Sequence, residues 1–165
     1  MSHSLYYQTP VGWIRLAENE SATAITHLLY VKDPVEEKAS FAAGSADGPP
    51  SPLLRQALGE LQEYFAGTRR AFTLPLEPAG TAFEQTVWST LRTIPYGETR
   101  SYRQIAQQIG RPAACRAVGR ANGRNPISLF IPCHRVIGAD GRLTGYAGGL
   151  DAKQRLLELE RGGSL

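Results

Sequence analysis

A cysteine, a histidine and an arginine stand side by side in the stretch Ile131-Pro132-Cys133-His134-Arg135-Val136. The thiolate is the reactive form of cysteine, and a neighbouring base and cationic groups favour it, so Cys133 is a candidate nucleophile. Pro132 has a fixed φ and biases the preceding residue toward an extended backbone, which gives the thiol a stiff support. The alternative is a buried structural cysteine, because free cysteine is among the most buried residue types.

The segments around this stretch predict how the thiol is positioned. The apolar run 127–130 predicts a short buried strand that leads directly to Cys133. Further upstream, Ser101 is a candidate N-cap for a helix that Gly110 ends, and Pro112 stands where a first-turn proline is tolerated. Two short helices joined at Gly110-Arg111 predict a helix-turn-helix.

The second of these helices, predicted over 112–123, combines small residues with Arg116, Arg120 and Arg124. A spacing of four places the arginines along one face, which a protein core would not accept. Residues 100–142 contain eight arginines and one acid, so they carry +7, whereas the rest of the chain carries −4. This distribution indicates a surface for a polyanion, with a solvated charged face or a tightly packed core helix as the alternatives.

The stretch Pro132-Cys133-His134-Arg135-Val136 resembles the active-site signature of the O6-alkylguanine-DNA alkyltransferases, of the bacterial type. The similarity runs from about residue 80 to about residue 160 and is weak in the first third of the chain. The other matching segments are Thr93-Ile94-Pro95-Tyr96-Gly97, Ser101-Tyr102, Arg116-Ala117-Val118-Gly119, Asn125-Pro126 and Gly145-Tyr146-Ala147-Gly148-Gly149. Several separated motifs in the same order make the resemblance specific.

The resemblance implies a chemistry for the site. Cys133 would attack the alkyl carbon of O6-alkylguanine, and of O4-alkylthymine as well. His134 would take the thiol proton through a water, Glu160 would orient His134, and Asn125 would be a buried hinge. The product is a thioether, which thiol exchange does not reverse, so one molecule repairs one lesion. No cofactor is implied.

The resemblance also implies how duplex DNA is bound and the damaged base reached. The base is flipped out of the duplex, with Arg116 filling the gap and Tyr102 crowding the lesion phosphate. Tyr146 would donate to the departing guanine, and Val136 would offer its carbonyl to the exocyclic amine. The predicted minor-groove helix contributes Ala114, Cys115, Arg116, Ala117, Gly119, Arg120 and Arg124. The minor groove reads bases poorly, which suits a repair protein.

Two positions depart from the family pattern. Ala147 stands where the family often has serine, so one pocket hydrogen bond must come from backbone. Cys115 stands where alanine is common and is interpreted as a small helix residue. Zinc occurs in some relatives, but Cys115, Cys133 and histidines at 3, 27 and 134 make no metal-ligand cluster, so no metal is expected.

The expected fold class is α/β (α+β), with a small domain over 1–78 that supports a DNA-binding and alkyl-acceptor domain over 79–165. By resemblance the first domain has an antiparallel sheet, and the second is mostly helical and winged helix-turn-helix-like. The predicted strands are two in 5–17 around a turn at residue 10, one at 24–31 and an edge strand at 72–76; a loop covers 32–50. The predicted helices are 52–66, 81–91 capped by Thr81, and 152–160 capped by Asp151.

Composition narrows the alternatives. Of 165 residues 42% are hydrophobic, enough for a packed core, and no apolar run is long enough to span a bilayer. We expect no export signal, no membrane partner, a reducing cytoplasm that keeps the thiol free, and a monomer for which cooperative binding on DNA is left open. Two other functions remain: a DNA-binding module without chemistry, and a cysteine hydrolase using Cys133 and His134.

Overall fold

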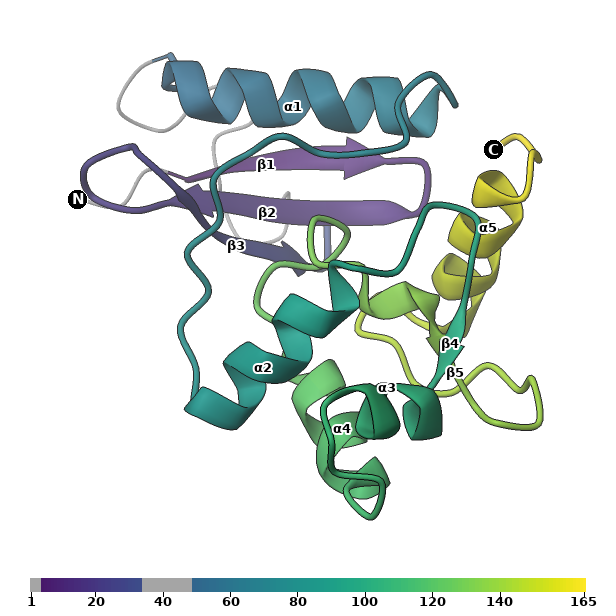
Figure 1. The fold of residues 1–165 in the computed structure, drawn as a ribbon. Coiled ribbons are helices and arrows are strands. Elements are labelled where there is room, and N and C mark those ends of the chain that lie inside the picture. The colour runs from purple at the N-terminus through teal and green to yellow at the C-terminus, as the bar shows by residue number, and fades with distance from the viewer. Residues whose placement is uncertain (1–3, 34–48) are drawn as a thin grey trace.

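The structure is a computed structural model and describes residues 4–33 and 49–165. A three-stranded antiparallel sheet with one long helix over it makes up the first half of the chain, and the second half is built mostly from short helices (Figure 1). The predicted mixed α/β fold with an antiparallel sheet is therefore confirmed. The predicted loop 32–50 lies, apart from its ends, outside the described residues.

The sheet has the order β1 (Ser4–Thr9), β2 (Gly12–Glu18) and β3 (Ile25–Tyr30), with all neighbours antiparallel. Helix α1 (Pro52–Phe65) lies across one face of it (Figure 1), and Ser51 Oγ caps this helix by accepting from Leu54 N at 3.0 Å. The three predicted strands and this helix are confirmed to within about two residues. The buried side chains that hold the helix on the sheet include Leu5, Ile14, Leu16, Leu54, Leu58 and Leu61.

The second half contains four α-helices among the described residues: α2 (Ala82–Leu91), α3 (Tyr102–Gln108), α4 (Cys115–Gly123) and α5 (Leu150–Glu160). Capping boxes begin the first two, with Thr81 paired to Glu84 and Ser101 paired to Gln104, so both predicted N-caps are confirmed. Gly110, with a φ of 76°, follows α3 in the left-handed conformation that glycine favours.

A short parallel pair joins β4 (Arg100–Ser101) to β5 (Val136–Ile137). It brings the start of α3 beside the 3-10 helix η2 (Cys133–Arg135), so Tyr102 and the candidate nucleophile come from neighbouring elements. Leu28 N in β3 donates to Pro126 O at 2.9 Å, and Ser128 N donates back to Leu28 O at 3.0 Å. Buried residues of both halves form one continuous cluster. The domain boundary between 78 and 79 stays a prediction.

The predicted strand 127–130 is wrong, although the run is buried as expected. Leu129 has a φ of 69°, and the chain turns back so that Ile131 N reaches Ile127 O at 2.9 Å. Only isolated bridges remain. Beyond the bridge to Leu28, the side chain of Asn125 bonds to Ile127 N and Ile131 O and so holds the turn where a strand would have continued.

Two predicted helix starts are also wrong. Pro112 does not open a helix: Ala114 N donates to Arg111 O at 2.9 Å, which closes a turn with proline in its preferred second position, and α4 begins at Cys115. Asp151 does not cap the final helix. Gly149 does, with a φ of 93° and its carbonyl accepting from Lys153 N at 3.1 Å, and Asp151 lies in the first turn.

The predicted edge strand 72–76 is reduced to one bridge, between Leu76 and Ile25. Thr73 N donates to the Glu60 side chain at 2.8 Å, and Pro75 has no N–H to donate, so the segment lacks the donors of a longer ladder. Among residues 4–33 and 49–165, no helix is long and apolar enough to cross a membrane.

Candidate active site

Cys133 is presented by a turn that asparagine side chains hold in place. Asn125 Nδ2 donates to Ile131 O at 2.8 Å, and its Oδ1 accepts from Ile127 N at 3.0 Å. Cys133 N donates to Ile131 O at 2.7 Å, and Asn122 Nδ2 donates to Cys133 O at 3.5 Å. The cysteine is 4% exposed, so the thiol lies in a buried and fixed position.

His134 follows in the same turn of 3-10 helix and is fully buried. Its Nε2 lies 2.7 Å from Glu160 Oε2, and its Nδ1 makes no hydrogen bond to any residue that the structure describes. Burial, opposed by Glu160, lowers the pKa of His134, so the ring is neutral near pH 7. A neutral ring that donates from Nε2 to a carboxylate keeps Nδ1 as a proton acceptor.

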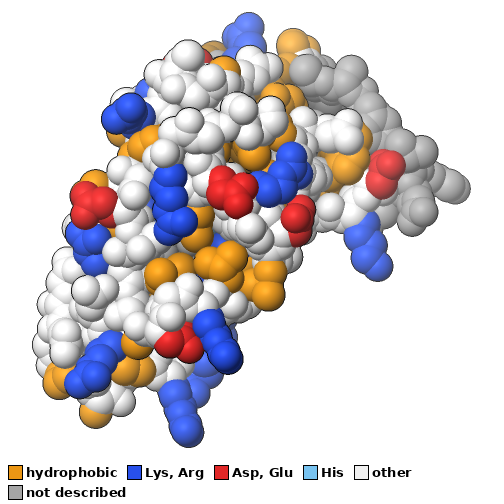
Figure 2. All heavy atoms as spheres, turned by 90° about the vertical axis from the view of Figure 1, so that its right-hand side faces the viewer, with side chains coloured by type: hydrophobic (Ala, Val, Ile, Leu, Met, Phe, Trp, Pro, Cys, Tyr) orange, Lys and Arg blue, Asp and Glu red, His pale blue; other side chains and the backbone are white. Residues whose placement is uncertain are grey.

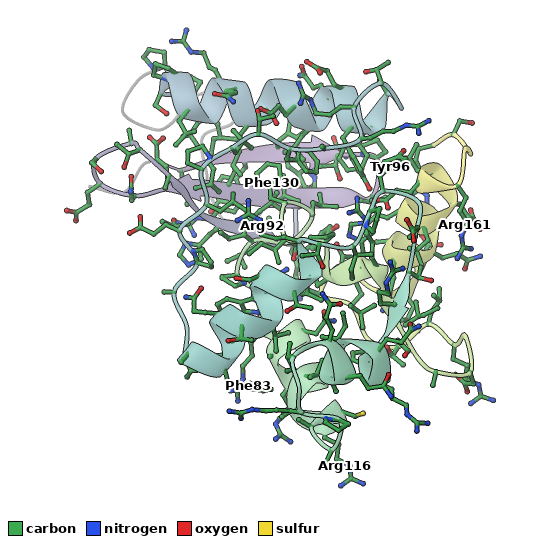
Figure 3. The ribbon with its side chains drawn as sticks, viewed as in Figure 1. Phe83, Arg92, Tyr96, Arg116, Phe130 and Arg161 are labelled. Carbon is green, nitrogen blue, oxygen red and sulfur yellow. The ribbon has the colours of Figure 1, made fainter. Side chains whose placement is uncertain are left out.

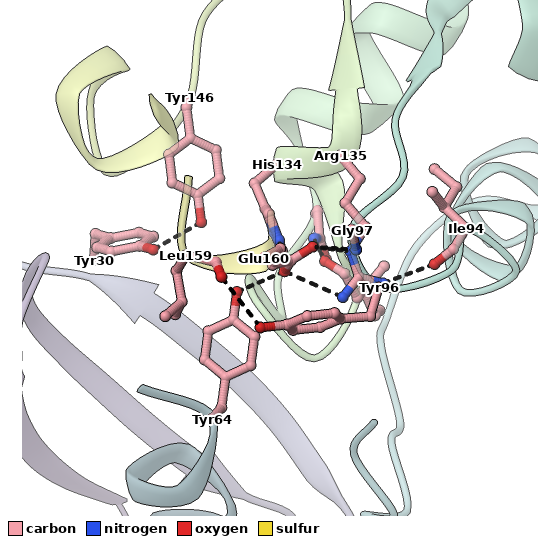
Figure 4. A network of polar contacts seen from close by, with 12 residues as sticks. Tyr30, Tyr64, Ile94, Tyr96, Gly97, His134, Arg135, Tyr146, Leu159 and Glu160 are labelled. Carbon is pink, nitrogen blue, oxygen red and sulfur yellow. Dashed lines mark hydrogen bonds and ion pairs between the residues drawn. The ribbon is translucent and has the colours of Figure 1, made fainter. Parts of the chain in front are cut away.

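Glu160, at the end of α5, collects donors from several distant segments (Figure 4). Arg135 donates from Nε to Oε1 at 2.8 Å and from Nη2 to Oε2 at 3.2 Å, and Tyr64 Oη donates to Oε2 at 2.6 Å. Burial raises the pKa of Glu160, but His134 and Arg135 more than offset this and hold it well below its usual range. Glu160 is therefore a buried carboxylate with a matched set of donors.

The backbone of Gly97 also bonds to the Glu160 carboxylate. Its N–H donates to Glu160 Oε1 at 3.3 Å, its φ is 83°, and a Cβ here would lie 3.0 Å from the Glu160 carbonyl oxygen. Both the backbone conformation and the close approach favour glycine.

The thiol itself is protonated in the resting site. Burial raises the pKa of Cys133, while hydrogen bonds with Asn125 and Ser128 and the positive charge of Lys153 lower it in part. A buried thiol of this kind requires a base to become nucleophilic. Arg135 does not face it: the guanidinium bonds to Glu160 and to Ile94 O.

Lys153 was missed by the sequence reasoning. Its side chain is fully buried, its Nζ donates to Thr144 O at 3.1 Å, and burial lowers its pKa. A signal was present, because Lys153 lies three residues before Leu156 and therefore on the apolar face of α5.

A cavity of about 320 Å³ lies between α4 and the loop before α5. The residues that line it are Tyr102, Gly119, Asn122, Gly123, Gly145, Tyr146 and Ala147. Tyr102 Oη bonds to Thr144 Oγ1 at 2.5 Å, which ties one wall of the cavity to the loop. The ring of Tyr146 lies 6.4 Å from that of His134, and Val136 is buried in β5 directly after η2. Three of the four predicted substrate-binding residues thus line one cavity.

The arginines of α4 lie on the outside of the molecule. Arg116, Arg120 and Arg124 are exposed, and Arg116 projects away from the body at the far end of α4 (Figure 3). Arg124 is within 3.9 Å of Glu84. Of the small residues predicted to touch DNA, Ala114 precedes the helix, Cys115 begins it, and Ala117 and Gly119 are half-buried. Basic side chains, drawn in blue, also project from the lower end of the molecule in Figure 2.

Two tyrosines of the first half reach the site and were not predicted. Tyr64 in α1 bonds to Glu160, and Tyr30 in β3 bonds to Tyr146 with their oxygens 2.7 Å apart. Neither carries a local signal, since both are aromatic residues of elements with an apolar face. Within the described part of the chain, no group of three or more His, Cys, Asp and Glu could hold a metal ion.

Comparison with known proteins identifies a family that matches nearly the whole chain. The family model for the DNA-binding domain of 6-O-methylguanine DNA methyltransferase matches residues 82–162, and the model for the ribonuclease-like domain of the same family matches residues 3–78. The methylated-DNA–protein-cysteine methyltransferase of Methanosarcina acetivorans is 46% identical over 93% of this chain and 95% of its own. The protein of that name from Mycobacterium bovis is 46% identical over 98% and 93%.

Solved structures are similar over the same length. The crystal structure of Mycobacterium tuberculosis O6-methylguanine methyltransferase superposes with a TM-score of 0.81 at 44% identity, covering 100% of this chain and 96% of that one. The structure of Mycobacterium tuberculosis OGT in complex with DNA gives a TM-score of 0.82 at 44% identity and covers 98% and 94%.

Proposed function

Because this chain belongs to the 6-O-methylguanine DNA methyltransferase family, we propose that it repairs alkylated DNA by moving the alkyl group from guanine O6 to its own Cys133. Its relatives are named for transfer of methyl groups from methylated DNA to a protein cysteine, and this chain is a methyltransferase of that class. Double-stranded DNA that contains O6-alkylguanine is the proposed substrate, and O4-alkylthymine is a second one.

The proposed reaction uses the buried group around Glu160. His134 accepts the thiol proton at Nδ1, through a water, while its Nε2–H keeps its hydrogen bond to the Glu160 carboxylate. The thiolate sulfur then bonds to the alkyl carbon, the bond from that carbon to O6 breaks, and its electron pair stays on the guanine. The resulting thioether is not reversed by thiol exchange, so each molecule acts once. Asn125 fixes the turn that presents the sulfur.

The cavity beside α4 is the proposed site for the damaged base. A base stacked in a duplex cannot reach Cys133, so the nucleotide is flipped into the cavity. Tyr146 donates to the departing guanine, the backbone at Val136 and Ala147 contacts its edge, and Tyr102 crowds the lesion phosphate.

Helix α4 is the proposed minor-groove element, since it is thin and carries exposed arginines. Arg116 occupies the gap in the stack, and Arg120 and Arg124 lie toward the phosphates. The small residues Ala114, Cys115, Ala117 and Gly119 allow the helix to lie close to the DNA backbone. The protein acts as a monomer, and a free thiol nucleophile is best kept in a reducing cytoplasm.

One observation carries the proposal. The buried cysteine is followed directly by a neutral histidine, whose Nε2 is bonded to a buried carboxylate and whose Nδ1 can accept a proton. The test is incubation with a duplex that contains O6-methylguanine, followed by mass analysis of the peptides. We expect one methyl group on Cys133 and none on Cys115, with product never exceeding protein. Binding without transfer would indicate a DNA-binding module, and multiple turnover of an ester or amide would indicate a cysteine hydrolase.

A further inference from the structure

Tyr30, the last residue of β3, contacts Tyr146 across 116 positions of sequence. The two hydroxyl oxygens lie 2.7 Å apart, and the rings meet edge to face with centroids 5.3 Å apart and planes at 70°. Figure 4 shows the two hydroxyls directed at each other, on the side of His134 that faces away from Arg135. A residue of the first half therefore bonds to the proposed guanine donor.

The backbone of the loop is fitted to the Tyr30 ring. A Cβ at Gly148 would lie 2.8 Å from Cε1 and 2.9 Å from Cζ of that ring, closer than real contacts allow. Glycine at 148 thus permits the loop to lie directly on Tyr30, and Tyr146 is held two residues earlier. Burial raises the pKa of both tyrosines, so both hydroxyls keep their protons at neutral pH.

Each of these hydroxyls has one proton, so only one of them donates in the pair. If Tyr146 donated to Tyr30, it would have no proton left for the guanine. We infer that Tyr30 is a positioning residue whose hydroxyl donates to Tyr146 Oη and so directs the Tyr146 proton to the departing guanine. The inference rests on the proposed role of Tyr146 and extends it to a residue outside the active-site motif.

The arrangement acts at the step in which the alkyl carbon leaves O6. The electron pair of the broken bond stays on the guanine, and the developing negative charge is stabilised by the Tyr146 hydrogen bond. A donor behind Tyr146 polarises that bond, because hydrogen bonds in a chain strengthen one another. The Tyr146 hydrogen bond is made to the base and does not involve the rest of the duplex, so the effect of Tyr30 should be the same for a free alkylated base. Docking of DNA on α4 is unaffected.

The experiment is a double-mutant cycle on the full chain with Tyr30→Phe, Tyr146→Phe and both together. Single-turnover alkylation of Cys133 is measured with an O6-methylguanine duplex and with free O6-benzylguanine. Tyr6→Phe is the matched control, because Tyr6 lies in the same sheet and no hydrogen bond of its hydroxyl to another described residue is seen. Phenylalanine retains the ring that Gly148 packs against, and duplex affinity and thermal unfolding are recorded for every variant.

We expect Tyr30→Phe to slow both substrates by about three- to tenfold, the equivalent of one hydrogen bond, with unchanged duplex affinity. In the Tyr146→Phe background it should slow neither substrate further. A Tyr30→Phe rate equal to that of wild type, while Tyr146→Phe is slow, would overturn the role of Tyr30 and leave the proposed donor role of Tyr146 in place. The same loss in both backgrounds would also overturn it, since Tyr30 would then act on the fold. A wild-type rate for Tyr146→Phe would overturn the donor role itself.

Discussion

Replacement of Glu160 by glutamine separates the chemical role of this residue from its structural one. The substitution keeps the shape of the side chain and removes its charge. In the wild type that charge receives three hydrogen bonds from the side chains of Arg135 and Tyr64, at 2.6–3.2 Å, besides the contact with His134. The amide leaves the buried guanidinium of Arg135 without its anion, because that side chain has no other acid partner among the described residues.

The expected loss of stability is large. Breaking a buried ion pair by removing one partner costs about 3–5 kcal/mol. For a chain of this size each kcal/mol lowers the melting temperature by about 2–4 °C, so Glu160→Gln should melt about 6–20 °C below wild type. Folded domains are stable by about 5–15 kcal/mol, so from the middle of that range upward the variant keeps enough stability to be assayed at low temperature.

The pH dependence of that loss has a definite sign. The pKa of Glu160 is held far below its ordinary value, so its stabilisation is fully present above the ordinary glutamate pKa of about 4.3. It is lost as the pH falls from there through the folded-state pKa. The stability difference between wild type and Glu160→Gln should therefore be constant between about pH 5.5 and 8 and shrink below about pH 4.

Alkylation should respond in a different pH range. Glu160 raises the pKa of His134, so the amide makes this histidine a weaker base and should slow transfer roughly tenfold or more at neutral pH. Since burial raises the pKa of Cys133, recovery of the rate should begin only above about pH 8.5. Duplex affinity should stay unchanged.

Stopped-flow alkylation from pH 6 to 9.5, together with urea unfolding, measures both effects. Glu158→Gln is the matched control, because it lies on α5 two residues earlier and is exposed. A neutral-pH rate equal to that of wild type would remove Glu160 from the mechanism. Loss of DNA binding would instead indicate misfolding.

Three further substitutions test neighbouring parts of the argument. Arg116→Ala should slow repair of duplex lesions at least tenfold more than reaction with free O6-benzylguanine, because the free base needs no flipping; equal losses in the two rates would assign Arg116 to the fold. Tyr64→Phe removes one hydrogen bond to a buried carboxylate and should lower the free energy of unfolding by about 1.5–3 kcal/mol, measured in urea; an unchanged value would contradict the structure. Lys153→Met removes a charge that lowers the pKa of Cys133, so alkylation should slow several-fold near pH 7 and approach the wild-type rate at high pH; a constant ratio across pH would contradict an electrostatic role.

Local patterns predicted the parts of the fold that local contacts determine. Thr81 and Ser101 cap their helices through contacts three residues away, so their side chains and spacing were sufficient evidence. The turn around residues 127–131 was missed because, after a single bridge to Leu28 of β3, the chain turns back on itself and the side chain of Asn125 holds the turn. An apolar run looks the same in both cases.

Fewer of the residues that meet at the site could be predicted from sequence patterns. Cys133 and His134 are adjacent, and the sequence indicates them directly, whereas Tyr64 lies 96 positions from Glu160 and Tyr30 lies 116 positions from Tyr146. Such contacts depend on how the sheet and α1 sit on the second half. Residues 1–78 were expected only to support the rest, and these two hydroxyls argue for a direct contribution.

Burial lowers the pKa of His134, and the arginine of the motif acts in the same direction. A histidine 2.7 Å from a lone buried carboxylate would gain a proton, since the opposite charge favours the charged ring. Arg135 bonds to the same carboxylate with two donors, and its positive charge offsets part of the effect by which Glu160 raises the pKa of His134. Burial has the largest effect on the pKa of His134, so the ring stays neutral and its Nδ1 can accept a proton. On the proposed mechanism Arg135 therefore serves Cys133 indirectly, because it shares the Glu160 carboxylate, which stays an ionised hydrogen-bond acceptor for the neutral ring of His134.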